Sequence, residues 1–279
     1  MSATVVTQLN PEIGVEITGV RGHEFVSATV AGDCHAALEA HGVVVYREAH
    51  LDDDDLVGFS RLLGQVHMRP LSTDSGRPEI SIVSLDPNRS LAAGVQPGTF
   101  VWHIDGTTEE FPHKATLLTC WEASNDGSGD TEFANTYAAY AALPDGDKAQ
   151  IADVLVEYGF ANEAHRTTPG ISDDSRAKWE SYPQRVRPLV WTHRDGRKSM
   201  LLGSTAGEVV GWPHDEGRAL LDRLLEWSTQ PRFVLRHHWR LGDLVVWDNT
   251  GMLHRALPYE LSSRRLMHRT ALLGDEEVA

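Results

Sequence analysis

Three His-x-Asp triplets could each offer two ligands to one metal ion: His50/Asp52, His103/Asp105 and His193/Asp195. In an extended segment residues i and i+2 project to the same side, so both side chains of such a triplet can reach one ion. Two imidazoles and a carboxylate on one face of a metal are the ligands of non-haem iron oxygenases, which keep the opposite positions for co-substrate and dioxygen. Among 14 histidines about one such triplet is expected by chance, so the context must separate them.

The context favours the middle triplet. Asp52 begins an acidic helix, where it is better explained as an N-cap, and Asp195 precedes Gly196 in a predicted hairpin turn. His103 and Asp105 lie in the apolar, aromatic and strand-like stretch TFVWHIDGT, where polar ligands would line the interior of a sheet. This pair is therefore the predicted proximal half of a metal site.

The third ligand should come from a distant strand of the same sheet. In the segment GDLVVWDNTGMLHRAL an apolar strand is followed by a turn at Gly251 and then by His254. A lone histidine beside an apolar strand is more often a satisfied core or surface residue, so His254 needs independent support.

Two arginines supply a second element of the site. Arg265 and Arg269 follow His254 by eleven and fifteen residues and alternate with Met267 along one face of a predicted strand. A 2-oxoglutarate that chelates iron through its keto and C1 carboxylate oxygens leaves its C5 carboxylate buried, and a bidentate guanidinium suits such a planar anion. Arginine-rich strand edges are also common, so this segment alone is equally compatible with a structural role.

Apolar periodicity outlines the elements that must position these residues. Helices are predicted at residues 34–40, 52–63, 136–143, 146–158 and 214–227. Strands are predicted near Val15, at residues 43–46, and in the last third at VRPLVWTH, KSMLLG, RFVLRHHW, DLVVWD and RRLMHRTALL. Residues 70–98 are rich in Ser, Pro, Gly and Asp, which predicts a mobile lid or substrate loop over residues 67–100.

Evenly spaced strands with inserted helices indicate a mixed α/β chain with a mainly β core, an antiparallel sandwich or jelly roll flanked by helices. No GxGxxG motif follows a strand and no GxxxxGK[ST] motif occurs, so dinucleotide and P-loop functions have no local support. A length of 279 residues with 41% hydrophobic residues is ordinary for one large domain, and we expect residues 1–279 to form one.

The charge balance limits the partners. Asp and Glu outnumber Lys and Arg by 40 to 25, which argues against a nucleic acid or an anionic membrane as partner. Cys34 and Cys120 form neither a disulfide framework nor a CxxC metal site. The chain shows no signal peptide and no run near the roughly 18 to 20 apolar residues of a membrane span. We expect a complete cytoplasmic protein that acts on a small molecule.

Four motifs in this order resemble the TauD/TfdA group of Fe(II)/2-oxoglutarate dioxygenases, which includes taurine and 2,4-dichlorophenoxyacetate dioxygenases and alkylsulfatases. They are WHID at residues 102–105, GDTEFANTYAAYAALP at 129–144, GDLVVWDN at 242–249, and the closing histidine and arginines from His254 to Arg269. Each motif alone is weak, but their joint occurrence nearly end to end is specific.

The resemblance implies a double-stranded β-helix, a cupin-like jelly roll, and a homo-oligomer such as a dimer or tetramer. It implies that Fe(II) is bound by His103, Asp105 and His254. A carboxylate at Asp105, where Ala or Gly would open a site for halide, disfavours a halogenase. The implied reaction uses 2-oxoglutarate and dioxygen, releases succinate and carbon dioxide, and hydroxylates a small organic acid.

The resemblance also assigns the co-substrate. Thr131 and Arg265 would hold the C5 carboxylate of 2-oxoglutarate, and Arg269 would face the C1 carboxylate or an anionic substrate. A zinc hydrolase could use the same His/Asp/His site with a metal-bound water, but it has no use for such a dicarboxylate clamp. A non-catalytic 2-oxoglutarate sensor on the same fold is the other alternative.

The substrate residues differ from those of the taurine enzymes. By the resemblance, Arg69 or His67 stands where those enzymes carry a sulfonate-binding histidine, and Thr99 stands where they carry an asparagine. Segments such as EVVGWPHDEGRALLDRLLEW look closer to the aryloxyalkanoate enzymes, so we expect an apolar or aromatic body bearing a carboxylate or sulfonate. Phe100 and Phe133 are possible aromatic neighbours of the site. The candidate substrate contacts are Arg69, Thr99, Trp102, Trp212 and Arg269, although each aromatic is equally compatible with a core position.

Overall fold

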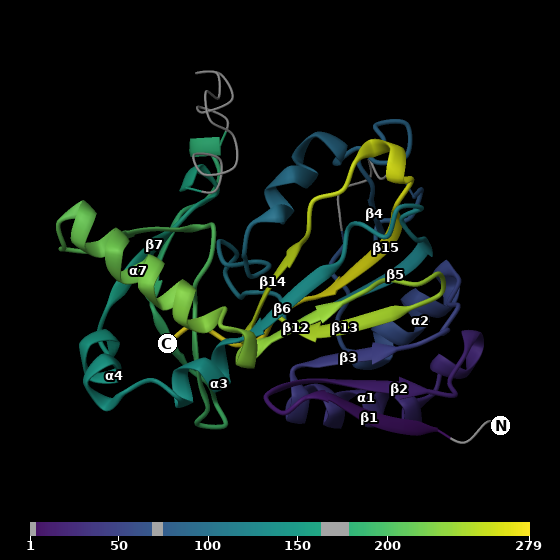
Figure 1. Cartoon of the computed structure of the whole chain (residues 1–279), viewed down its shortest axis with the longest axis horizontal. Helices are drawn as coiled ribbons and strands as arrows, with labels where there is room; N and C mark the ends of the chain where they lie inside the picture. Colours follow the sequence, from purple (N-terminus) through teal and green to yellow (C-terminus); the bar gives the residue numbers. More distant parts are fainter. Residues whose placement is uncertain (1–3, 69–74, 163–178) are drawn as a thin grey trace.

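Two antiparallel-rich sheets face each other in the computed structural model, which describes residues 4–68, 75–162 and 179–279 (Figure 1). The large sheet has the strand order β1-β2-β3-β13-β5-β15-β4 and the small sheet the order β12-β6-β14. The large sheet comprises β1 (Val5–Asn10), β2 (Ile13–Thr18), β3 (Val43–Tyr46), β4 (Ser81–Val83), β5 (Ala115–Glu122), β13 (Leu244–Asp248) and β15 (Leu266–Leu272). The small sheet comprises β6 (Thr131–Asn135), β12 (Val234–His237) and β14 (Met252–Ala256).

The central strands are buried on both faces, which explains their unbroken apolar sequence. In β3, Val43 and Val45 enter the core between the two sheets, whereas Val44 and Tyr46 enter the core beneath the helices. Successive side chains of a strand point to opposite faces, so an all-apolar strand fits only between two layers. The helices are α1 (Ala28–His41) and α2 (Asp53–Leu63), and they cover the outer face of the large sheet (Figure 1).

The start of α2 follows the local rules that its sequence suggested. The side chain of Asp52 accepts a hydrogen bond of 2.8 Å from the backbone N–H of Asp55. The acidic first turn lies at the positive end of the helix dipole. Asp52 is thus used as a cap, as its sequence context predicted.

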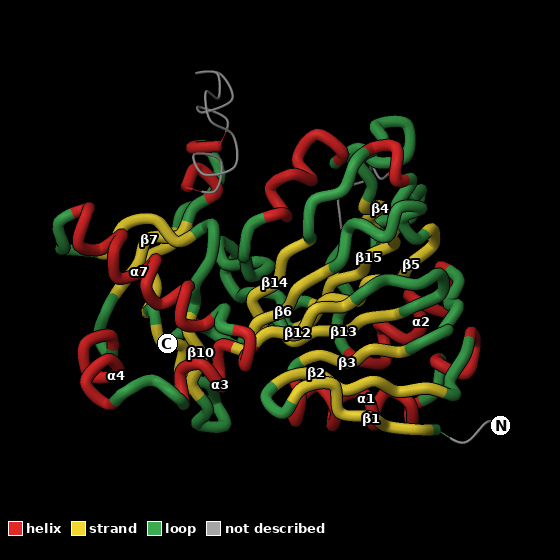
Figure 2. The backbone as a smooth tube through the Cα atoms, viewed as in Figure 1, coloured by secondary structure: helices red, strands yellow, loops and turns green. Residues whose placement is uncertain are grey.

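The chain between β6 and β12 builds a second lobe with its own apolar core, seen beside the two sheets in Figure 2. Trp191, Tyr158 and Leu224 are among its fully buried residues. Its elements are α3 (Thr136–Ala141), α4 (Asp145–Ile151), β7 (Leu155–Tyr158), β8 (Arg185–Pro188), β9 (Val190–Thr192), β10 (Lys198–Met200), β11 (Ala206–Val209) and α7 (His214–Ser228).

Two predicted elements differ from the structure, and one strand was not predicted. The helix predicted at residues 146–158 ends at Ile151, because the next residues form β7 between β8 and β11 and bury Val156 and Tyr158 on the core side. The stretch TFVWHIDGT is not a strand: its first two residues end a 3-10 helix (Ala93–Phe100), and the rest is a loop. An isolated β-bridge from His103 to His254 joins this loop to the small sheet. Strand β1 was not predicted, because its side chains are mostly exposed and show no buried face.

The predicted fold class is confirmed, since a mainly β sandwich with flanking helices is present. Among the described residues, no helix is both long enough and apolar enough to cross a bilayer. Part of the predicted lid, residues 69–74 with Arg69, lies outside the described residues.

Replacing Asp52 by Ala should lower the free energy of unfolding by about 1 kcal/mol, because the first turn of α2 loses its cap. Urea unfolding of the two proteins measures this. Asp153→Ala, at an exposed position after α4, is the control and should leave the midpoint unchanged. Equal midpoints for all three proteins would contradict the capping role.

Candidate active site

The backbone places His103 and His254 directly opposite each other. The N–H of His103 donates to the carbonyl of His254 over 3.0 Å, and the N–H of His254 donates to the carbonyl of His103 over 2.9 Å. Residues paired in this way on antiparallel segments project their side chains to the same face. The two imidazole centroids accordingly lie 4.2 Å apart.

A glycine permits this approach from behind. A Cβ on Gly203, whose φ is +117°, would lie 2.8 Å from the carbonyl oxygen of Trp102 and 2.9 Å from the Cα of His103. No real Cβ makes such contacts. The second lobe therefore supports the histidine loop through a residue that must lack a side chain.

Carbonyl oxygens set the orientation of both imidazoles. Nδ1 of His103 lies 2.8 Å from the carbonyl oxygen of Val101, and Nδ1 of His254 lies 3.5 Å from that of Met252. A carbonyl can only accept, so each Nδ1 carries the proton and each Nε2 is left as a lone-pair donor. Both rings thus offer the nitrogen that a metal ion requires.

Asp105 completes the donor set. Its Oδ2 lies 3.7 Å from Nε2 of His254, and it accepts hydrogen bonds from Thr116 Oγ1 over 2.9 Å and from the Arg269 guanidinium. One potential ligand atom each from His103, Asp105 and His254 lie within 4.8 Å of one another. Among the described residues, no other group of three or more His, Cys, Asp or Glu side chains could hold a metal ion in this way.

The protonation states suit metal binding. Burial raises the pKa of Asp105, but the nearby Arg269, His254 and His103 together hold that pKa well below its usual range. Burial, with the neighbouring His103 and Arg269, lowers the pKa of His254 to about 3. At neutral pH the site therefore offers an anionic carboxylate and a neutral imidazole, which are the forms that bind metals.

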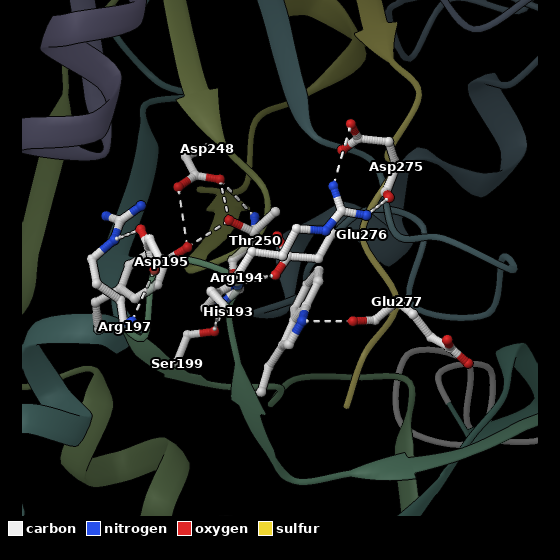
Figure 3. A network of polar contacts seen from close by, with 12 residues as sticks. His193, Arg194, Asp195, Arg197, Ser199, Asp248, Thr250, Asp275, Glu276 and Glu277 are labelled. Carbon is white, nitrogen blue, oxygen red and sulfur yellow. Dashed lines mark hydrogen bonds and ion pairs between the residues drawn. The ribbon is translucent and has the colours of Figure 1, made fainter.

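The other two triplets have structural partners. In the β9–β10 hairpin, Nε2 of His193 lies 2.8 Å from Ser199 Oγ and its Nδ1 3.6 Å from Glu276, while Asp195 accepts from Arg197 (Figure 3). Asp52 is the cap of α2. The structure thus separates the three triplets as their contexts predicted.

Arg265 is a buried cation with unpaired hydrogen-bond donors. It is 3% exposed, and its Nε and Nη1 have no hydrogen-bond partner among the described residues. Its guanidinium carbon lies 4.9 Å from the ring centre of Tyr259 and 5.9 Å from that of Trp239. Burial lowers the pKa of Arg265, whereas Tyr259 opposes that shift. Burying an unpaired charge is costly, so this pocket fits an anion.

Thr131 lies beside the same pocket. Its Oγ1 accepts a hydrogen bond of 2.9 Å from Nε1 of Trp239, so Trp239 touches both predicted clamp residues. Gly129 keeps the approach open, because a Cβ there would lie 2.7 Å from Cδ of Arg265. Sequence reasoning missed Trp239 and Tyr259, since an aromatic residue near a strand end gives no signal that separates a pocket wall from a core.

The candidate substrate residues do not all gather at the donor set. Trp102 is buried in the core of the second lobe with Arg255 stacked 4.6 Å over its ring, and Trp212 packs against the same core. Thr99 lies in the 3-10 helix whose last residue, Phe100, contacts Tyr259 with ring centroids 5.7 Å apart. Arg269 reaches Asp105 directly.

Comparison with known proteins decides the family. Residues 6–271 match the family described as "Taurine catabolism dioxygenase TauD, TfdA family". The chain belongs to the TauD/TfdA family. It is an Fe(II)- and 2-oxoglutarate-dependent dioxygenase, and the expected cofactors are confirmed with the reaction class.

The curated relatives of this dioxygenase are named for different substrates. The alpha-ketoglutarate-dependent 2,4-dichlorophenoxyacetate dioxygenase of Cupriavidus pinatubonensis is 33% identical over 289 residues, covering 99% of this chain and 100% of the relative. The alpha-ketoglutarate-dependent sulfate ester dioxygenase of Pseudomonas putida is 30% identical, covering 95% and 88%. The crystal structure of AAD-2 in complex with Mn(II) and N-oxalylglycine has a TM-score of 0.84 at 28% identity, covering 99% and 100%.

Replacing His103, Asp105 or His254 by alanine removes a direct ligand and should therefore weaken Fe(II) binding strongly. The loss should exceed the roughly 10–100-fold that follows when a residue hydrogen-bonded to a ligand is removed. Anaerobic calorimetric titration measures the affinity. His50→Ala and His193→Ala, which alter the other triplets, should bind as the unaltered protein does. Loss of binding in His193→Ala with binding intact in His103→Ala would place the metal elsewhere.

Proposed function

We propose that this dioxygenase holds Fe(II) through His103, Asp105 and His254 and hydroxylates a small organic acid of the aryloxyalkanoate kind, or another carboxylate or sulfonate. The metal assignment is supported by the convergence of three donor atoms, and by an anionic Asp105 and a neutral His254 at neutral pH. It is also supported by two β-bridged histidines, whose positions are fixed by the backbone.

The observation that carries the co-substrate assignment is the buried guanidinium of Arg265, whose Nε and Nη1 have no partner among the described residues. A carboxylate bound at an edge of this guanidinium would accept from a donor that is otherwise unpaired, and the planar fork of arginine suits bidentate binding of such an anion. Thr131 adds a hydroxyl beside the same pocket. We infer that this is where the C5 carboxylate of 2-oxoglutarate binds.

Arg269 has a different position and a different task. Its guanidinium lies against Asp105 and 3.4 Å from Thr116 Oγ1, next to the donor set. Its positive charge there favours the C1 carboxylate of 2-oxoglutarate or the anionic group of a substrate. Arg265, just before β15, and Arg269, within it, would thus recognise opposite ends of a bound dicarboxylate.

When bound, iron and 2-oxoglutarate supply the oxidising chemistry, with succinate and carbon dioxide as products. The residues of the chain orient the metal and the co-substrate and exclude water. His103 and His254 present Nε2, Asp105 keeps its negative charge, and Arg265 and Arg269 fix the direction of the co-substrate. The apolar inter-sheet core, with Phe133 fully buried next to His254, keeps water from one side of the site.

The substrate class rests on the relatives and on a nearby aromatic pair. Phe100 contacts Tyr259, which borders the Arg265 pocket, so aromatic side chains lie next to that pocket. The relatives act on 2,4-dichlorophenoxyacetate and on sulfate esters. Trp102, Trp212, Thr99 and Arg69 stay candidates for substrate contact, with Arg69 outside the described residues.

We propose in addition that residues 1–279 act as one cytoplasmic dioxygenase domain, that residues 67–100 act as its lid, and that the chain forms a dimer or tetramer. The free outer strand β1 exposes Val5 by 55% and Val6 by 62%. Exposed apolar edge strands pair readily with another chain, so a second copy of this chain is the favoured occupant. Light scattering in solution measures the mass.

Adding Fe(II) and 2-oxoglutarate to the apoprotein without oxygen should produce the weak visible charge-transfer band of a chelated keto acid. Arg265→Ala should lose the band at matched 2-oxoglutarate, because the C5 carboxylate loses its buried partner. The neighbouring Arg264→Ala is the control, since Arg264 is 74% exposed in its side chain and should keep the band. No band with iron fully bound would contradict the placement of 2-oxoglutarate at these residues.

Succinate release measured across a substrate panel tests the substrate class. Aryloxyacetates should stimulate turnover most, alkyl sulfates less and taurine least, because Thr99 stands where the taurine enzymes carry an asparagine. Formation of the hydroxylated product, measured in the same reactions, distinguishes coupled turnover from futile consumption of 2-oxoglutarate. Stronger stimulation by taurine than by any aryloxyacetate would reverse this assignment.

A further inference from the structure

A chain of hydrogen bonds leads from the inter-sheet core to Asp105. Trp247 Nε1 donates to Asn249 Oδ1 over 2.9 Å, and Asn249 Nδ2 donates to Thr116 Oγ1 over 2.8 Å. Thr116 Oγ1 donates to Asp105 Oδ2 over 2.9 Å. Trp247 is 2% exposed, and Asn249 and Thr116 are 0% exposed, so water does not compete for these groups.

The direction of the chain is fixed at its inner end. An indole N–H can only donate, so the amide oxygen of Asn249 must face Trp247 and its NH₂ group must face Thr116. The threonine hydroxyl therefore accepts from Asn249, and it also lies 3.4 Å from a nitrogen of Arg269, which can only donate. A hydroxyl has two acceptor sites and one proton, so its proton is left for Asp105.

The register of the large sheet builds this arrangement. Trp247 in β13 is paired with Thr116 in β5, and β5 is paired on its other side with β15, which carries Arg269. Asn249 follows β13 and its backbone N–H donates to the carbonyl of Lys114 over 3.0 Å. Strands β5 and β15 thus deliver the two donors of one carboxylate, and the residue that follows β13 directs one of them.

We propose that Thr116 and Asn249 are positioning residues for the metal ligand Asp105, and that they raise the affinity of the site for a divalent ion. This inference rests on the proposed metal site. The hydroxyl holds the carboxylate in one orientation before the ion arrives, and Asn249 acts through Thr116 by keeping the hydroxyl proton directed at Asp105. Partners of this kind typically contribute about 10–100-fold in metal affinity.

The test is a titration of the full-length apoprotein with Mn(II), in which the electron paramagnetic resonance signal of free Mn(II) measures binding without turnover. Thr116→Val keeps the shape of the side chain and removes its hydroxyl, so the affinity should fall about 10–100-fold. Thr116→Ser restores the hydroxyl and should recover most of that loss. Asn249→Leu should lower the affinity less, because the hydroxyl is retained but no longer directed.

The double variant decides whether Asn249 acts through Thr116. Thr116→Val with Asn249→Leu should bind no more weakly than Thr116→Val alone, because the two residues form one path. Additive losses, or an unchanged affinity in Asn249→Leu, would overturn the role of Asn249. An unchanged affinity in folded Thr116→Val would overturn the whole proposal.

A control separates general destabilisation from a defect of the site. Thr119, also in β5, is 3% exposed and donates to the carbonyl of His268 over 3.2 Å. Thr119→Val should lower the melting temperature without changing Mn(II) affinity. If His103→Ala itself binds Mn(II) as the unaltered protein does, the metal site is wrong. If only that variant loses binding and Thr116→Val does not, the site stands and the positioning role falls.

Discussion

Two backbone hydrogen bonds join the loop at His103 to strand β14 at His254. Residues directly opposite each other in an antiparallel pair have their side chains on the same face, so the two imidazoles lie side by side. The metal donors are therefore positioned by the main chain, whose geometry is far stiffer than that of long side chains. Gly203, in the second lobe, packs closely against the backbone of this loop. The second lobe therefore supports the loop that carries His103.

The charged residues around the two histidines differ in how deeply they are buried. Asp105 and Arg269 neutralise each other beside the histidines, whereas Arg265 lies deeper and has donors to spare. Arg265 immediately precedes β15 and Arg269 lies within it, so a single short segment of chain carries both cations. A ligand with two carboxylates can pair with both guanidinium groups, whereas a ligand with one carboxylate can pair with only one of them.

Much of this could be predicted from residue types and spacing, and the rest could not, for physical reasons. The Asp52 cap and the Asp195 turn are local, so the surrounding sequence identifies them. The helix predicted across Tyr158 fails because β7 is stabilised by pairing with β8 and β11, which periodicity cannot report. The roles of Trp239, Thr116 and Asn249 depend on contacts between distant strands, and a single sequence carries no sign of such contacts.

The two unpaired donors of the buried Arg265 guanidinium affect how stable the folded protein is in the cell. A ligand that binds only the folded state stabilises it by RT ln(1 + [L]/Kd), about 2.7 kcal/mol when the ligand is at a hundred times its dissociation constant. A keto acid that relieves a buried charge is such a ligand. The abundance of the folded chain, through its resistance to proteolysis, would thus rise and fall with the supply of a central metabolite that the same chain consumes.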